Sequence, residues 1–231
     1  MSLLSLRRKL LPDYAVIPVI LWVIGQAISF YATRILNHFI YGGYENFCDI
    51  SISLDSIIPV VPQWIYIYIL TYAFWVISFF LICHESKEMC CKALSAEMLG
   101  KIVCAIIFIS LPTFIVRPEV EVDSLSTFLL NFIYKADTPD NLFPSMHCSI
   151  SYFAVRYVLK CSKIPKWYKI SAVVMTVLIC FSVVFTKQHV FLDIPGGLLV
   201  AEICSQISDR LEFKKIYEKL DIGSSYERKS K

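Results

Sequence analysis

The sequence predicts an all-α integral membrane protein with six spanning helices in a single domain over residues 1–231. Of these residues, 57% are hydrophobic and 18% are charged, whereas water-soluble domains average about 45–50% apolar and about 25% charged residues. The apolar residues gather in runs that reach the length needed to cross a hydrocarbon layer roughly 30 Å thick. Short charged stretches separate the runs. Because the runs and their connections use nearly the whole chain, we expect any chemistry to come from loops and helix ends.

The flanks and composition of the runs justify each expected span. The first run is too long for the hydrophobic part of a signal peptide, so we interpret it as a retained helix. Trp64 and Trp167 open the second and fifth runs, as in an aromatic belt. The fourth run is the most polar, but the charge distribution requires it, and Arg156 near its end can extend to the interface. The expected spans are Tyr14–Tyr31, Trp64–Cys83, Ile102–Val116, Met146–Leu159, Trp167–Phe185 and Val190–Ile207.

The basic residues predict the orientation of these spans. With six spans both chain ends lie on one side, and all but four of the 22 Lys and Arg residues fall on that side. The exceptions are Arg34, Arg117, Lys135 and Lys187. Lys and Arg are enriched in cytoplasmic loops, so we expect a multi-pass protein of the cell membrane with both termini cytoplasmic. The net charge of +3 is too small to suggest a nucleic-acid partner.

Several ionisable residues would meet at the outer ends of the spans. Arg117 would end the third span, His147 would begin the fourth, and Lys187, His189 and Asp193 would lie at the start of the sixth. Each has an ordinary explanation when taken alone, such as a snorkelling Arg or a stabilising pair of residues on one helix face. Together they indicate function, because ionisable groups at membrane depth are costly.

This set of groups suits phosphoryl transfer. A helix that starts at Ser145 directs backbone N–H groups toward an anion, and Arg117 can bind phosphate through two hydrogen bonds. His189 can attack phosphorus if Asp193, one helical turn away, holds its other ring nitrogen. His147 can protonate the leaving alcohol and later deprotonate the acceptor.

The motifs Arg117-Pro118, Pro144-Ser145-x-His147 and His189-x-x-x-Asp193 resemble the three signature motifs of the type 2 phosphatidic acid phosphatase superfamily. The resemblance spans residues 102–207, and residues 208–231 form a cytoplasmic tail outside it. It implies a six-helix bundle whose metal-independent and cofactor-free site faces the extracytoplasmic side. It also implies that His189 is the nucleophile through a phosphohistidine, that Asp193 is its partner, that His147 is the acid and base, and that Arg117 and Ser145 bind phosphate.

Two positions depart from the family pattern. Ser110 stands where the family usually has Lys, and Val183 stands where it usually has Arg. Lys187, two residues before His189, can partly replace the missing charges as a phosphate ligand. The pattern Thr186–His189 followed by Gly196-Gly197 is more similar to the branch of inositol phosphorylceramide and sphingomyelin synthases. These enzymes pass a phosphoryl headgroup to another lipid.

The sequence therefore predicts an enzyme that acts on a lipid phosphate or a phospholipid headgroup, by hydrolysis or by transfer to a second lipid. The main alternative is a catalytically inactive relative that binds lipid or serves as a scaffold, suggested by Ser110 and Val183. A transporter is less favoured because the charges gather at one face. A metal site is disfavoured by Arg117 and Lys187, which would repel a cation.

Other segments carry weaker expectations. His38 and His84 are expected on polar connections, and the outer loop 36–63 is expected to lie over the site. The pair Gly196-Gly197 is expected to allow a kink and close helix packing. Cys90 and Cys91 are interpreted as reduced or acylated thiols. The tail is expected to form a short interfacial helix that becomes disordered by Gly223. A solvated acidic face is expected from Glu119, Glu121, Asp123, Asp137 and Asp140.

Overall fold

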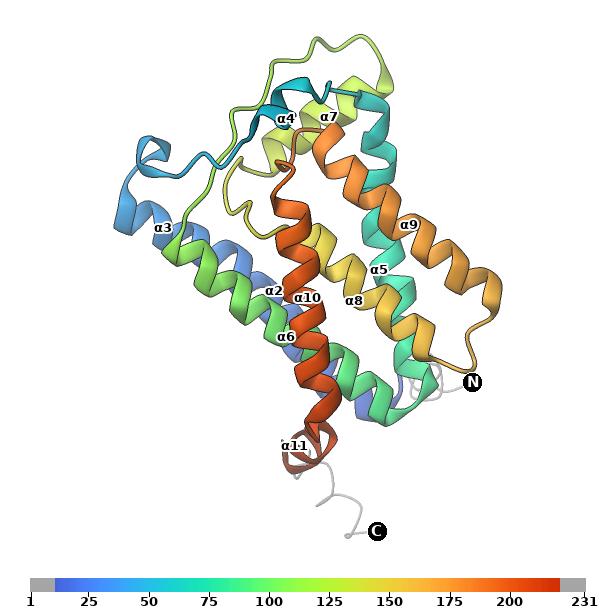
Figure 1. The fold of residues 1–231 in the computed structure, drawn as a ribbon. Coiled ribbons are helices and arrows are strands. Elements are labelled where there is room, and N and C mark those ends of the chain that lie inside the picture. Colours follow the sequence, from blue (N-terminus) through green and yellow to red (C-terminus); the bar gives the residue numbers. More distant parts are fainter. Residues whose placement is uncertain (1–10, 221–231) are drawn as a thin grey trace, which may run out of the picture.

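The computed structural model describes residues 11–220, and this part of the chain is all-helical (Figure 1). Within residues 11–220 the only β-type backbone pairing is two isolated β-bridges, one between Cys48 and Thr113 and one between Phe114 and Asp140. The first helical rod comprises Asp13–Ala15 (η1), Val16–Ala27 (α2), the π-helical Ile28–Ala32 (η2) and Thr33–Tyr41 (α3). The other elements are η3 (Tyr44–Asn46), α4 (Ser53–Ile57), η4 (Pro62–Trp64), α5 (Ile65–Glu85), α6 (Lys87–Ser110), α7 (Leu125–Ala136), α8 (Met146–Lys160), α9 (Lys166–Phe185), α10 (Asp193–Arg210) and α11 (Phe213–Leu220).

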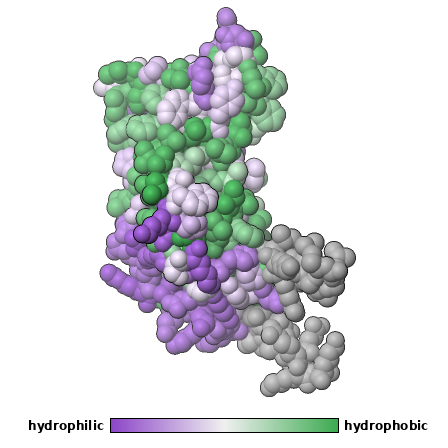
Figure 2. All heavy atoms as spheres, turned by 90° about the vertical axis from the view of Figure 1, so that its right-hand side faces the viewer, coloured by the Kyte–Doolittle hydropathy of each residue, from purple (hydrophilic) through white to green (hydrophobic). Residues whose placement is uncertain are grey.

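Four helices in the described part of the chain are long and apolar enough to cross a membrane. They are Asp13–Tyr41, Pro62–Glu85, Lys87–Ser110 and Lys166–Phe185. Large apolar side chains on the outward faces of these helices are exposed, for example Val76 and Ile106. Figure 2 shows hydrophobic residues over the upper and middle parts of one face, with hydrophilic residues gathered at its lower end. This surface is compatible with an integral membrane protein.

The third expected span is wrong in its bounds. We expected Ile102–Val116, but α6 begins at Lys87 and ends at Ser110. Ser86 caps the helix by accepting a hydrogen bond of 3.1 Å from the backbone N–H of Met89, a common way to satisfy first-turn donors. Pro112 follows the end of the helix, and Arg117 lies in the extended chain beyond it. The first helix is also longer than expected, since its helical rod continues to Tyr41.

A buried ion pair explains why hydropathy alone misplaced α6. Lys101 was expected on the cytoplasmic side, but it lies within the helix, 2.9 Å from Glu97 one turn earlier. Both side chains are almost fully buried. The Nζ of Lys101 donates to the backbone oxygen of Trp22 at 2.8 Å and lies 4.6 Å from the centre of its ring. Two charges that pair inside the bundle thus lower the local hydropathy of a helix that remains continuous.

Helix α8 is the most buried helix of the bundle and packs against α5, α6, α9 and α10 (Figure 1). A glycine permits the close approach of α10 to the start of α8. A Cβ atom added to Gly197 would collide with the backbone oxygen of Ser145, at the start of α8. The neighbouring Gly196 faces the ring of Phe143. The expectation of close helix packing at this glycine pair is therefore confirmed.

The two ends of the described chain lie at the same end of the bundle. Near the N-terminus, the hydroxyl of Tyr14 donates to the backbone oxygen of Cys83 near the end of α5. Helix α11 confirms a helix early in the tail, and the hydroxyl of its Tyr217 contacts Ser95 of α6. Helices α4 and α7 lie at the opposite end (Figure 1). The expected disorder from Gly223 onward lies outside the described residues.

Candidate functional site

A cavity of about 310 Å³ opens near α7, at the end of the bundle opposite α11. We call it the inner cavity. Its polar lining includes Arg117, His147, Gln188 and His189. Its apolar and aromatic lining comes from the first helix, α5, α7 and α8, and includes Phe30, Tyr31, Tyr72, Trp75, Ile133 and Ile150. The fold therefore brings three predicted site residues, far apart in sequence, to one cavity with a largely apolar wall.

His189 and Asp193 form the pair that their spacing predicted. The Nδ1 atom of His189 lies 2.9 Å from Oδ2 of Asp193, and the same oxygen accepts the backbone N–H of Val190 at 3.0 Å. Asp193 is fully buried at the first residue of α10. A carboxylate on Nδ1 orients the ring and stabilises its cation. Nε2 is therefore the ring nitrogen that can act on a ligand.

His147 and His189 both line the inner cavity, and their rings pack edge to face with their centres 5.8 Å apart. His147 belongs to the first turn of α8. Its ring packs against Tyr68 and Trp75, with centres 4.6 and 5.4 Å away. Its Nε2 atom is buried and has no hydrogen-bond partner among the described residues. A buried polar atom without a partner is costly, and here it indicates a place for a ligand.

Arg117 enters the site from the extended chain after α6. Its guanidinium donates to the side-chain oxygen of Gln188 at 2.6 Å and to the backbone oxygen of Asp137 at 2.5 Å. It also packs over the ring of Tyr134. Burial lowers the pKa of Arg117, and the nearby carboxylate of Asp137 opposes this shift. No carboxylate of the described chain pairs with this guanidinium directly, so its positive charge is available to an anion.

Two more polar atoms at the same wall have no partner within residues 11–220. They are Nε of Arg117 and the side-chain nitrogen of Gln188, and both are buried. Together with Nε2 of His147, they provide nitrogen atoms that a phosphate group can satisfy. Gln188 was not predicted as a site residue. Its position directly before His189 was the available signal.

Ser145 is a helix cap and does not line the inner cavity. Its hydroxyl accepts a hydrogen bond from the backbone N–H of Cys148 at 3.3 Å, and its own N–H donates to the backbone oxygen of Asp193 at 3.1 Å. The predicted cap is confirmed. Ser145 is fully buried and lines neither this cavity nor the hollow described below, and its phosphate contact stays a prediction.

Lys187 has a structural role that was not predicted. Its Nζ atom donates to the backbone oxygens of Asp55 and Ile58, both at 2.7 Å. The Asp55 carboxylate in turn accepts the backbone N–H of Phe191 at 2.7 Å. These bonds fasten α4 to the turn that carries His189, so the outer loop 36–63 reaches the site, as expected. They use two of the three N–H donors of the ammonium group, and its phosphate contact stays a prediction.

The fastened loop borders a second, open hollow of about 530 Å³, which we call the outer cavity. Its polar lining includes Ser51, Asp55 and Ser56 from the loop, and Lys187 from the turn. Most of its lining is apolar and comes from Ile52, Ile58, Val60, Ile115, Val116 and Pro118. Arg117 and His189 line it as well, so these two residues border both cavities.

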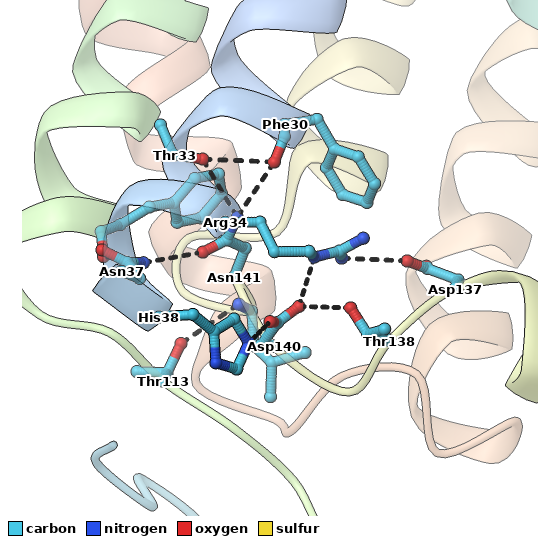
Figure 3. Close-up of polar contacts among 12 residues, drawn as sticks. Phe30, Thr33, Arg34, Asn37, His38, Thr113, Asp137, Thr138, Asp140 and Asn141 are labelled. Carbon is cyan, nitrogen blue, oxygen red and sulfur yellow. Dashed lines mark hydrogen bonds and ion pairs between the residues drawn. The ribbon is translucent and has the colours of Figure 1, made fainter. Parts of the chain in front are cut away.

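A charged cluster beside the inner cavity was not predicted (Figure 3). Arg34 binds Asp140 at 2.6 Å and Asp137 at 3.2 Å, and His38 contacts Asp140 at 3.3 Å. Asp140 is buried, and it also accepts from Thr138. Asp137 and Asp140 are therefore not part of a solvated acidic face, and His38 lies in helix α3 instead of a polar connection. The outer location of Arg34 was the available signal, but its partners are more than 100 residues away.

Comparisons with protein-family models, with curated proteins and with solved structures find no match for this chain. Within residues 11–220, no group of three or more His, Cys, Asp or Glu side chains is arranged to hold a metal ion. The candidate chemistry therefore follows from the side chains that border the two cavities.

Proposed function

We propose that this chain is a membrane-embedded phosphoryl-transfer enzyme that acts on a lipid phosphate or a phospholipid headgroup, as in the type 2 phosphatidic acid phosphatase superfamily. One observation carries the proposal. His189, held by Asp193 through Nδ1, lies beside His147 at the inner cavity, and the guanidinium of Arg117, which no carboxylate of the described residues pairs with, lines the same cavity. A nucleophile with an orienting carboxylate, a second proton-transfer group and an anion-binding cation are the parts that this chemistry needs.

Each group has a role in this proposal. Nε2 of His189 attacks phosphorus, and the Asp193 carboxylate stabilises the positive charge that develops on the ring. His147 protonates the alcohol oxygen that leaves and then takes a proton from water or an acceptor hydroxyl. Arg117 and the backbone N–H groups in the first turn of α8 stabilise the negative charge on the phosphoryl oxygens. The apolar wall of the inner cavity holds the lipid body.

The membrane topology is part of the same proposal. Helices α8 and α10 would complete six spans, with the two chain ends in the cytoplasm and the site at the extracytoplasmic face. The described ends of the chain lie opposite the inner cavity, as six crossings require. Helix α8 has 15 residues and is about 22 Å long, so it depends on longer neighbours to cover its ends.

A second candidate is a lipid-binding protein without catalytic activity. It is favoured by Ser110, whose hydroxyl contacts two backbone oxygens of its own helix, and by Val183, which is buried in the core. Neither supplies the positive charge that the resembling family has there, and Lys187 is occupied by the outer loop. This candidate predicts binding of lipid phosphate without turnover.

The test is turnover by the purified protein in detergent and in liposomes, with a chelator present. Phosphatidate, a prenyl diphosphate and phospholipids with larger headgroups would be offered, with and without a lipid alcohol as acceptor. We expect phosphate release or headgroup transfer by the wild type and none by His189→Ala. His84→Ala is the matched control, because this histidine lies near the end of α5 and lines neither cavity. Equal rates for wild type and His189→Ala would contradict the proposal.

A further inference from the structure

The charged groups that line the inner cavity do not balance. Asp137 and Asp140 are the only Asp or Glu residues among residues 11–220 that line it, and Arg117 is the only Lys or Arg. If these three side chains acted alone, an anion in the cavity would meet two negative charges and one positive charge. Charges interact strongly where water is scarce, so an anion site here needs a further cation.

Arg34 of the first helix supplies that cation (Figure 3). Its Nε atom donates to Oδ1 of Asp140 at 2.6 Å, and its second guanidinium nitrogen donates to Oδ1 of Asp137 at 3.2 Å. The Asp140 side chain is fully buried. Arg34 does not line the inner cavity, so it neutralises both carboxylates without taking up space for a ligand.

Asp137 contacts both arginines, through different groups. Its backbone oxygen accepts from the guanidinium of Arg117 at 2.5 Å, while its carboxylate accepts from Arg34. The Asp137 side chain is 26% exposed, so tight packing does not lock it in place. A carboxylate and a guanidinium form strong paired hydrogen bonds. Without Arg34, the Asp137 carboxylate would be free to turn onto Arg117, which its own backbone already touches.

The backbone around Asp137 and Asp140 has anchors that do not depend on Arg34. The side chain of Asn141 donates to Oγ1 of Thr33 at 3.0 Å and accepts from Asn37 at 3.1 Å. The backbone oxygen of Pro139 accepts from the N–H of Ile115 at 3.0 Å. Loss of Arg34 is therefore expected to release the two carboxylates more than it displaces the chain that carries them.

We propose that Arg34 is a positioning residue of this site. It binds the carboxylates of Asp137 and Asp140, and it thereby keeps the guanidinium of Arg117 free for an anion. The inference rests on the proposed function in one respect, namely that Arg117 binds the phosphoryl group. Arg34 itself touches no substrate and acts through Arg117.

The test measures binding of inorganic phosphate to the purified full-length protein in detergent, by isothermal titration calorimetry. Arg34→Met alone would leave the buried Asp140 carboxylate without its guanidinium, so the variants start from Arg34→Met with Asp140→Asn. The first variant keeps Asp137, and the second adds Asp137→Asn. These two proteins differ only by an oxygen and a nitrogen of similar size, and thermal unfolding checks that both are folded.

The expected results follow from the fate of the Asp137 carboxylate. Arg117→Met should weaken phosphate binding by roughly tenfold to a hundredfold, as for loss of a hydrogen bond to a charged group. Arg34→Met with Asp140→Asn should weaken it by about tenfold or more, because Asp137 then pairs with Arg117. Adding Asp137→Asn should restore binding to within about threefold of the wild type.

Two further variants separate this role from a general disturbance of the fold. Adding Arg117→Met to Arg34→Met with Asp140→Asn should weaken binding by less than about twofold more, because both changes remove the same contact. Arg156→Met is the matched control. Arg156 also joins two carboxylates, those of Glu202 and Asp209, but it lines neither cavity, so its loss should leave phosphate binding unchanged.

Unchanged phosphate binding in Arg34→Met with Asp140→Asn would overturn the inference. So would a loss of binding that Asp137→Asn does not restore in the folded protein, since the cause would then be a displaced backbone. The expected pattern of phosphate binding without turnover of any lipid would support the inference and overturn the proposed function. Absence of phosphate binding by the wild type, or equal binding by Arg117→Met, would overturn the role of Arg117 and this inference with it.

Discussion

Two buried pairs of ionisable residues in this molecule have the same spacing but different surroundings. His189 with Asp193 and Glu97 with Lys101 are both separated by four residues, and both pairs have a contact of 2.9 Å. All four side chains are buried. His189 borders two cavities. Glu97 and Lys101 line neither, and Lys101 is closed off by Trp22 of the first helix.

The difference between the two pairs indicates which buried ionisable residues belong to a functional site. An ion pair within a packed bundle can serve packing alone, and removing one partner is costly because it leaves the other charge uncompensated. The pair at His189 is accompanied by open volume and by unpartnered polar atoms on His147 and Gln188. Burial and pairing are common to both regions. Buried polar atoms without a hydrogen-bond partner also occur at both pairs, including the two carboxylate oxygens of Glu97. Space for a ligand is found at only one of them, the pair at His189.

Among the variants that test this comparison, Asp193→Asn is expected to have the largest effect. Loss of the carboxylate should favour the wrong tautomer of His189 and lower kcat by about 10³- to 10⁴-fold. Glu97→Gln should leave kcat nearly unchanged, because its pair does not border the site. Lipid turnover by both purified variants checks this. A similar loss of kcat in the two variants would remove the distinction.

Lys101→Met is expected to have the next largest effect, and on stability instead of turnover. This change leaves the buried Glu97 carboxylate without a counter-charge, which should lower the free energy of unfolding by about 3–5 kcal/mol. The double variant Glu97→Gln with Lys101→Met should recover much of this loss, because no charge is then left unpaired. Thermal unfolding in detergent measures it. A double variant no more stable than Lys101→Met would refute the ion-pair explanation.

Gly197→Leu should have an intermediate effect on both stability and turnover. Its side chain would collide with the backbone oxygen of Ser145 and push α10 away from the start of α8, at a cost of about 1–3 kcal/mol. Turnover should fall because Asp193 and His147 are carried by these two helix ends. Gly196→Ala is the control, since it meets only the ring of Phe143, which can move. An equal effect of both changes on stability and rate would contradict this.

The smallest effect is expected from Lys187→Met. It removes the bonds to the backbone oxygens of Asp55 and Ile58, and we expect turnover to fall by only about three- to tenfold, as α4 loosens over the site. Burial lowers the pKa of Lys187, and Asp55 opposes that shift. Proteolysis within the outer loop should become faster. A loss as large as that of Asp193→Asn would instead support the phosphate-binding role predicted from the sequence.

Local features of the site were predictable, and long-range ones were not. The contact between His189 and Asp193 was predicted from a spacing of one helical turn, but α10 begins only at Asp193, and His189 lies in the turn before it. The cap at Ser145 follows from its place before a helix. The partners of Lys187 are about 130 residues away, and no periodicity reveals them. The ends of α6 were misplaced because Glu97 and Lys101 lower its hydropathy, and only their contact inside the fold shows that both belong to the helix.

Trapping of a phosphorylated enzyme tests the central claim most directly. Wild type and His189→Ala would be mixed with lipids labelled at phosphorus, quenched in base and digested. We expect the label on the peptide that contains His189, stable in base and lost in acid, and absent from the His189→Ala protein. A label that persists in that variant, or turnover by the wild type without any labelled peptide, would contradict the assignment of His189 as the nucleophile.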